Sequence, residues 1–87
     1  MSEYVEARYA KLVLSEARSA EGDLASKLID DLLHDLKLSQ DLNAARAQAV
    51  TSLRQLSLSL DRPQSLHARE WEAADQAAEA WCRKAFH

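Results

Sequence analysis

Glycine and proline are almost absent from this chain of 87 residues, which contains one of each, Gly22 and Pro63. Soluble proteins ordinarily contain roughly 7% glycine and 5% proline. Folds rich in β-hairpins need these residues at many turns, so their scarcity argues against such a fold. The sequence is rich instead in alanine, leucine, glutamate, arginine and glutamine, all strong helix formers. We therefore expect an all-α protein.

A single cysteine and the shortness of every apolar run exclude further classes. Cys82 has no second cysteine with which to form an intrachain disulfide, and a lone thiol is typical of a reducing cytoplasm. Residues 1–4 show no basic stretch leading into an apolar one, so no secretory signal is expected. No apolar run exceeds three residues, whereas crossing a bilayer takes about 20. The sequence predicts a cytoplasmic protein without a membrane partner.

Charge of either sign is too evenly mixed to indicate a nucleic-acid-binding or DNA-mimicking surface. Fourteen acidic and eleven basic side chains leave a formal net charge of −3. Nucleic-acid binders usually carry a basic stripe, because neutralising phosphates supplies much of their affinity. A DNA mimic would need a denser acidic face than this balance provides. The charge favours another protein as the partner and does not favour nucleic acid.

Four helical segments are expected within a single domain, since a chain of this length forms one core. Gly22 suits the left-handed position that follows a helix, and Ser39 or Asp41 can cap the start of one. Pro63 disfavours helix at Arg62. The expected helices are 3–20, 24–38, 41–60 and 66–85. Together they predict a small four-helix bundle.

Apolar residues recur at helical spacing in each of the first three expected helices, which predicts the face that each one buries. On 3–20 the stripe is Val5, Tyr9, Leu12, Val13, Ala17 and Ala20; on 24–38 it is Leu24, Leu28, Ile29, Leu32, Leu33 and Leu36; and on 41–60 it is Leu42, Ala45, Ala49, Leu53, Leu56 and Leu60. Leu58 lies off the third stripe and is expected to be exposed.

The last expected helix, 66–85, has the most regular pattern. Six positions recur at spacings of 4, 3, 4, 3 and 4, the seam of a helix that packs lengthwise on another. They are His67, Trp71, Ala74, Ala78, Trp81 and Ala85. The short link before this helix forces an antiparallel hairpin with 41–60. In that hairpin Ala45 and Ala49 leave room for Trp81.

Few side chains are arranged for chemistry. Asp30, Asp31 and His34 share a helix face at metal-ligand spacing, but zinc needs further ligands and a di-iron bundle needs a second Glu-x-x-His pair. We therefore interpret them as a solvated acidic face and expect no cofactor. Cys82 has no helix N-terminus to lower its thiol pKa. Because a phosphate-binding loop and a Ser/His/Asp set are also lacking, we do not expect an enzyme.

By elimination, the leading interpretation is a small module that binds another protein as an inhibitor, antagonist or regulatory subunit. Its size and acidity also fit proteins encoded by phages or mobile elements, such as anti-defence proteins and toxin antagonists. The expected contact surfaces are the nearly uncharged polar side of 42–60, the acidic outer face of 66–85 and one tryptophan edge. The residues are Arg46, Gln48, Arg54, Gln55, Trp71, Glu72, Asp75 and Glu79.

Two alternative functions stay open. Arg46, Arg54 and Arg62 lie eight residues apart and form a sparse basic ridge, so the chain could be a nucleic-acid-linked regulator that binds as a helical dimer. A helix-turn-helix would need a tight turn that the sequence does not provide. The second alternative is a metal-binding helical bundle that uses the cluster in 30–34. A homodimer through the polar face of 42–60 or an exposed tryptophan is a separate hypothesis.

Overall fold

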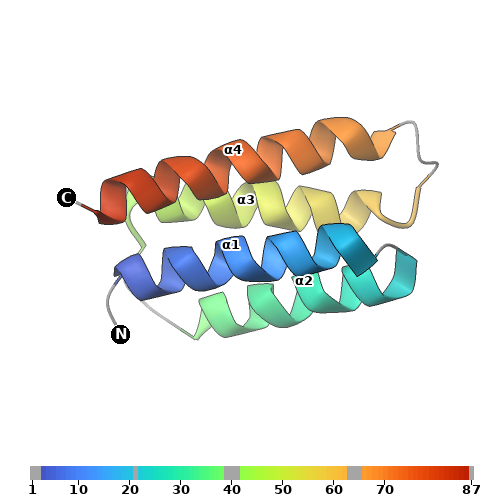
Figure 1. The fold of residues 1–87 in the computed structure, drawn as a ribbon, viewed down its shortest axis with the longest axis horizontal. Helices are drawn as coiled ribbons and strands as arrows, with labels where there is room; N and C mark the ends of the chain where they lie inside the picture. The colour runs from blue at the N-terminus through green and yellow to red at the C-terminus, as the bar shows by residue number, and fades with distance from the viewer. Residues whose placement is uncertain (1–2, 21, 39–41, 63–65, 87) are drawn as a thin grey trace.

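The computed structural model describes residues 3–20, 22–38, 42–62 and 66–86. Within these ranges the chain forms four α-helices and no strand: α1 (Glu3–Ala20), α2 (Gly22–Lys37), α3 (Ala44–Ser59) and α4 (His67–Ala85). Successive helices alternate in direction, so α1 begins and α4 ends at the same end of the molecule (Figure 1). This up-and-down bundle confirms the predicted all-α, four-helix architecture.

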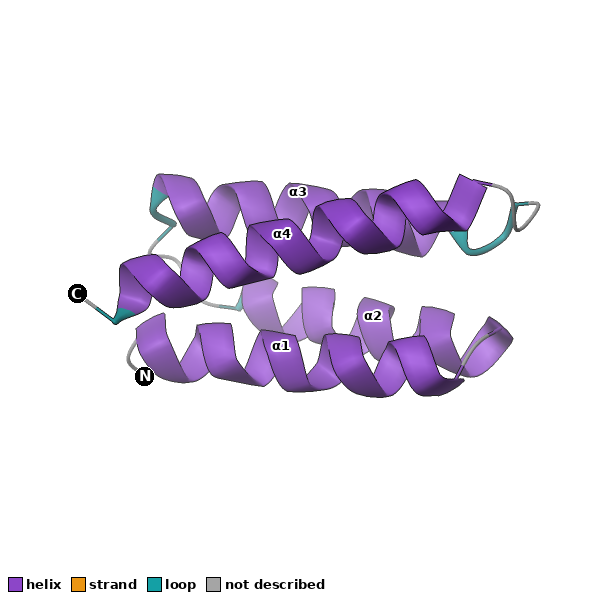
Figure 2. Ribbon diagram, turned by 45° about the horizontal axis from the view of Figure 1, so that its top comes forward, coloured by secondary structure: helices purple, strands orange, loops and turns teal. Residues whose placement is uncertain are grey.

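The four helices pack as a ring of neighbours. Each of α1 and α3 lies against both α2 and α4. In a second view the α3–α4 pair lies over the α1–α2 pair (Figure 2). The predicted antiparallel hairpin of α3 and α4 is therefore confirmed. The cross-section of 21 × 18 Å is about two helix diameters in each direction, so side chains fill the space between the helices.

The helix ends match the expected boundaries to within three residues. Gly22, the first residue of α2, has a φ of 62°, the left-handed conformation that the sequence predicts for it, and this backbone rather than lack of space favours glycine there. The cap of α3 differs from the prediction. Asn43 caps this helix by accepting a hydrogen bond from the Arg46 N–H at 2.8 Å. Ser39, Asp41 and Pro63 lie outside the described residues.

The core combines large residues of α2 and α3 with alanines of α1 and α4. The predicted stripe of α2 is buried from Ile29 to Leu36, although Leu24 is exposed and Ala25 is buried. In the predicted seam of α4, Ala74, Ala78 and Trp81 are buried and the other positions are half-buried. On α3, Ala45, Ala49, Leu53 and Leu56 are buried. Leu58 is 63% exposed, which confirms that it lies off the stripe.

The predicted buried face of α1 is only partly right: Val13 and Ala17 are buried as expected, but other positions of the stripe are not. The helix buries Ala7, Ala10, Val13, Leu14 and Ala17. Val5, Tyr9 and Leu12, which were expected in the core, are exposed. The physical reason is the size of the side chains: alanines spaced three and four residues apart let α1 approach its neighbours closely. Leu12 therefore lies on the molecular surface, where it is 61% exposed.

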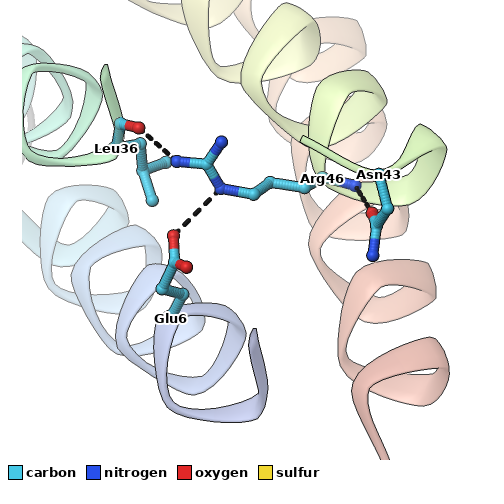
Figure 3. Close-up of polar contacts among 4 residues, drawn as sticks. All are labelled: Glu6, Leu36, Asn43 and Arg46. Atoms are coloured by element: carbon cyan, nitrogen blue, oxygen red, sulfur yellow. Dashed lines mark hydrogen bonds and ion pairs between the residues drawn. The ribbon is translucent and has the colours of Figure 1, made fainter. Parts of the chain in front are cut away.

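One charged residue of α3 is buried inside the bundle. Arg46 is 1% exposed, and its Nε donates to Oε2 of Glu6 on α1 at 2.9 Å. Its Nη2 donates to the carbonyl oxygen of Leu36 near the end of α2 (Figure 3). Such terminal carbonyls lack a helical partner, and the helix dipole favours a cation beside them. The side chain therefore links three helices. Its prediction as a partner-binding residue is corrected accordingly, because no partner can reach it.

Candidate protein-binding groove

Three predicted contact residues lie on the outside of α3. Gln48, Arg54 and Gln55 are all exposed. Arg46, expected beside them, lies in the core instead. The exposed face is therefore polar, with Leu58 as its large apolar side chain. It offers little apolar area for a tight contact.

Of the acidic residues predicted on the outer face of α4, two form ion pairs with α1 and one faces solvent. Asp75 pairs with Arg18 of α1, with Oδ2 and Nη1 2.8 Å apart, and Glu79 pairs with Lys11 of α1. These half-exposed ion pairs add little to the stability of the bundle, because water screens them. Their main effect is on the register of α1 against α4. Glu72 is exposed, and Trp71 is half-buried beside the core.

A groove between α1 and α4 brings together residues that the sequence pattern did not connect. Its lining residues come from the first half of α1 and the end of α4. The start of α1 and the end of α4 lie at the same end of the bundle (Figure 1). The groove has a volume of about 390 Å³, and it is lined by Tyr4, Arg8, Lys11, Leu12, Glu79, Cys82, Arg83 and Phe86. Of these eight residues, only Glu79 was among the predicted contacts.

The apolar part of the groove is built around Leu12 and Phe86. Phe86 is 72% exposed. Its backbone N–H donates to the Cys82 carbonyl at 3.1 Å, which fixes the residue just beyond the end of α4. The Tyr4 ring meets the Phe86 ring edge-on, with centroids 4.8 Å apart and planes at 80°. Phe86 therefore stays exposed at a position that neighbouring groups hold in place, and Leu12 is the second large exposed side chain of the groove.

The charged part of the groove is mostly cationic. Arg8, Lys11 and Arg83 carry three positive charges, against the single negative charge of Glu79. The hydrogen bond from Lys11 lowers the pKa of Glu79 and raises the pKa of Lys11. Both groups are therefore charged at neutral pH, and the groove has a local charge of +2 in a chain of net charge −3. This contrast in sign bears directly on what the groove can bind.

Cys82 contributes a half-buried thiol to the lining of the groove. The side chain is half-buried, and this burial raises the pKa of the thiol. Since the thiolate is the reactive form, a raised pKa leaves the thiol protonated at neutral pH. The groove thus pairs a protonated thiol with Leu12 and the Tyr4–Phe86 rings.

The side chains considered for metal binding lie on the outer side of α2. Asp30, Asp31 and His34 are exposed, and Asp30 accepts a hydrogen bond from the buried Ser57 hydroxyl of α3. Over the described part of the chain, no group of three or more His, Cys, Asp and Glu side chains is placed to hold a metal ion. None of the described helices combines the length and apolar character needed to cross a bilayer.

In comparisons with known proteins, no family model matches the chain, and no curated protein or solved structure is significantly similar to it.

Proposed function

We propose that this protein is a small protein-binding module that acts as an inhibitor, antagonist or regulatory subunit, and that the α1–α4 groove is its docking surface. The observation that supports the proposal is the exposure of Leu12 and Phe86 on either side of a concave surface. Exposed apolar groups rimmed by charge are typical of protein interaction sites. Burying one such side chain contributes roughly 1.5–3 kcal/mol.

Three further parts of the proposal concern catalysis, location in the cell and origin. The protein binds and does not catalyse, because the Cys82 thiol in the groove is protonated and the Glu79 carboxylate is paired with Lys11. It acts in the cytoplasm, where an unpaired thiol such as Cys82 is typical. A phage or mobile-element origin, as for anti-defence proteins and toxin antagonists, agrees with its size and charge.

The two alternative functions lose part of their basis. The basic ridge proposed for a nucleic-acid-linked regulator contains Arg46, whose guanidinium lies in the core, so Arg54 and Arg62 remain on the surface. The metal-binding alternative depends on Asp30, which is already a hydrogen-bond acceptor for Ser57. Protein binding through the groove therefore has the stronger support.

Photo-crosslinking in the source cell tests the proposal. A photoreactive amino acid replaces Leu12 in one variant and Leu58 in another, because both leucines are about equally exposed. We expect a crosslinked protein from position 12, lost when Phe86→Asp is added, and none from position 58. Crosslinking that is absent at position 12, or equal at both positions, would rule out the groove as the docking surface.

A further inference from the structure

We infer that the occupant of the groove is an acidic amphipathic α-helix of a partner protein. The inference rests on the proposed function and adds the chemistry and the secondary structure of the partner. It is carried by the shape of the groove, the placement of its apolar side chains and the sign of its charge.

The shape of the groove fits a helix. Two antiparallel helices, α1 and α4, form its walls, and a third helix can lay a ridge of side chains between two such neighbours. The lining residues of α1 run from Tyr4 to Leu12, about 12 Å at the helical rise of 1.5 Å per residue. A partner helix of two to three turns covers this length.

The apolar side chains specify the contacting face of the partner. Leu12 on α1 and Phe86 after α4 stand on opposite walls of the groove. A helix that fills the space between them presents apolar residues at spacings of three and four, the helix-in-groove mode of recognition. Phe86 is held by the Tyr4 ring and the end of α4, so binding does not require it to be ordered first.

Charge determines the flanks of the partner. Lys11 already pairs with Glu79. Arg8 donates to the Tyr4 hydroxyl and has no carboxylate at ion-pair distance within the described ranges, while the Arg83 Nε is 3.9 Å from Glu79. Arg8 and Arg83 are thus available for acidic side chains on the two flanks of the bound helix.

The charges and the shape of the groove disfavour two other occupants, a second copy of this chain and a lipid bilayer. In a two-fold dimer, each copy would set Arg8, Lys11 and Arg83 against the same three cations of its mate. An anionic bilayer would be attracted by these cations, but a concave groove between two helices matches a narrow ridge better than a flat surface. A helix with acidic flanks satisfies the shape and the charge together.

The experiment is a selection from a displayed library of random peptides of about 16 residues, long enough for about four helical turns. The immobilised full chain is used as wild type, as Leu12→Asp and as the charge-reversed double variant Arg8→Glu/Arg83→Glu. Two matched controls, Leu58→Asp and Arg54→Glu/Arg62→Glu, change exposed residues elsewhere. Circular dichroism checks that every variant keeps its helices.

We expect the wild type to enrich acidic peptides with apolar residues at helical spacing. For the enriched peptides, Leu12→Asp lowers the affinity by about tenfold or more, the size of effect expected for a central interface residue. Charge reversal shifts the selection to basic peptides. Both controls behave as the wild type does.

Several results would overturn the inference. These are no enrichment, enrichment of basic or non-helical peptides, or an unchanged preference after charge reversal. A dimer that is seen in sedimentation and abolished by Leu12→Asp would also overturn it. Binding to vesicles of equimolar phosphatidylcholine and phosphatidylserine that depends on Phe86 would do the same. If crosslinking at position 12 succeeds while the selection fails, the docking surface stands and the partner chemistry is wrong. If crosslinking fails as well, the proposed function fails with it.

Discussion

Glu6 and Arg8 lie two residues apart on α1, and the two side chains have opposite surroundings. Glu6 turns inward and pairs with the buried Arg46, which also hydrogen-bonds to the end of α2. Arg8 turns outward into the groove, where its hydrogen bond goes to the Tyr4 hydroxyl. A charge without water must be paired within the fold, whereas a solvated charge stays available for a partner. The first therefore stabilises the bundle, and we propose that the second serves binding.

Removing the buried cation is expected to have the largest effect on stability. Arg46→Met leaves the Glu6 carboxylate and the Leu36 carbonyl without their partner. Loss of one member of a buried ion pair costs about 3–5 kcal/mol, which urea denaturation measures. Arg54→Met, on the exposed side of the same helix, is the control and changes stability by less than about 0.5 kcal/mol. Equal effects of the two substitutions would contradict the burial of Arg46.

The two leucines of α1 test the corrected orientation of that helix. Leu14 is buried and Leu12 is exposed. Leu14→Ala is expected to lower the unfolding free energy by about 2–5 kcal/mol, and Leu12→Ala by less than about 0.5 kcal/mol. The same denaturation measurement compares them. A larger loss of unfolding free energy for Leu12→Ala than for Leu14→Ala would indicate that α1 buries the face that the sequence pattern predicted.

The Lys11–Glu79 pair should make a small, pH-dependent contribution to stability. The pKa of Glu79 is below its ordinary value of 4.5, so the contribution is present above that value and disappears as pH falls through the lower pKa. The pKa of Lys11 is above its ordinary 10.5, so the contribution also disappears as pH rises through that higher pKa.

Thermal melts of the wild type and Glu79→Gln at several pH values measure this contribution. The difference between the two proteins should be constant from about pH 5 to 10 and vanish in acid. High salt should reduce it, since the pair is half-exposed. A difference that persists at pH 2 would show that Glu79 acts through packing rather than charge.

The smallest expected effect is on the reactivity of Cys82. Burial raises the pKa of its thiol, so alkylation by iodoacetamide near pH 8 should be slower than for a free cysteine. In urea the rate should rise to that of the free thiol. Mass spectrometry follows the reaction. A rate above that of free cysteine in the folded protein would indicate an activated nucleophile and contradict a purely apolar role.

The sequence predicts the fold well where one helix face is clearly more apolar than the other. On α2 the leucines from Leu32 to Leu36 share one face, and on α4 the seam around Trp81 has no competitor. On α1 two apolar stripes compete. Alanines such as Ala7 and Ala10 are weakly apolar, so the pattern favours the larger Tyr9 and Leu12. The choice between them depends on how closely neighbouring helices approach, which is a tertiary property.

The site was harder to predict than the fold for a related reason. The groove joins residues from the start and the end of the chain, such as Tyr4 and Phe86, and no local spacing connects them. Arg46 likewise finds Glu6 at a separation of 40 residues. The sequence does contain one indication of the groove. Leu12 is apolar but does not share the face of α1 on which Ala7, Ala10 and Ala17 are buried.

The most direct test of the central claim is the affinity of Leu12→Asp, compared with that of Leu58→Asp, for one acidic helical peptide enriched by the wild type. Both substitutions place a carboxylate on a leucine of nearly equal exposure, one inside the groove and one outside it. We expect a loss of about tenfold or more for Leu12→Asp and an unchanged affinity for Leu58→Asp. Equal affinities of the two variants would contradict binding of the peptide in the groove.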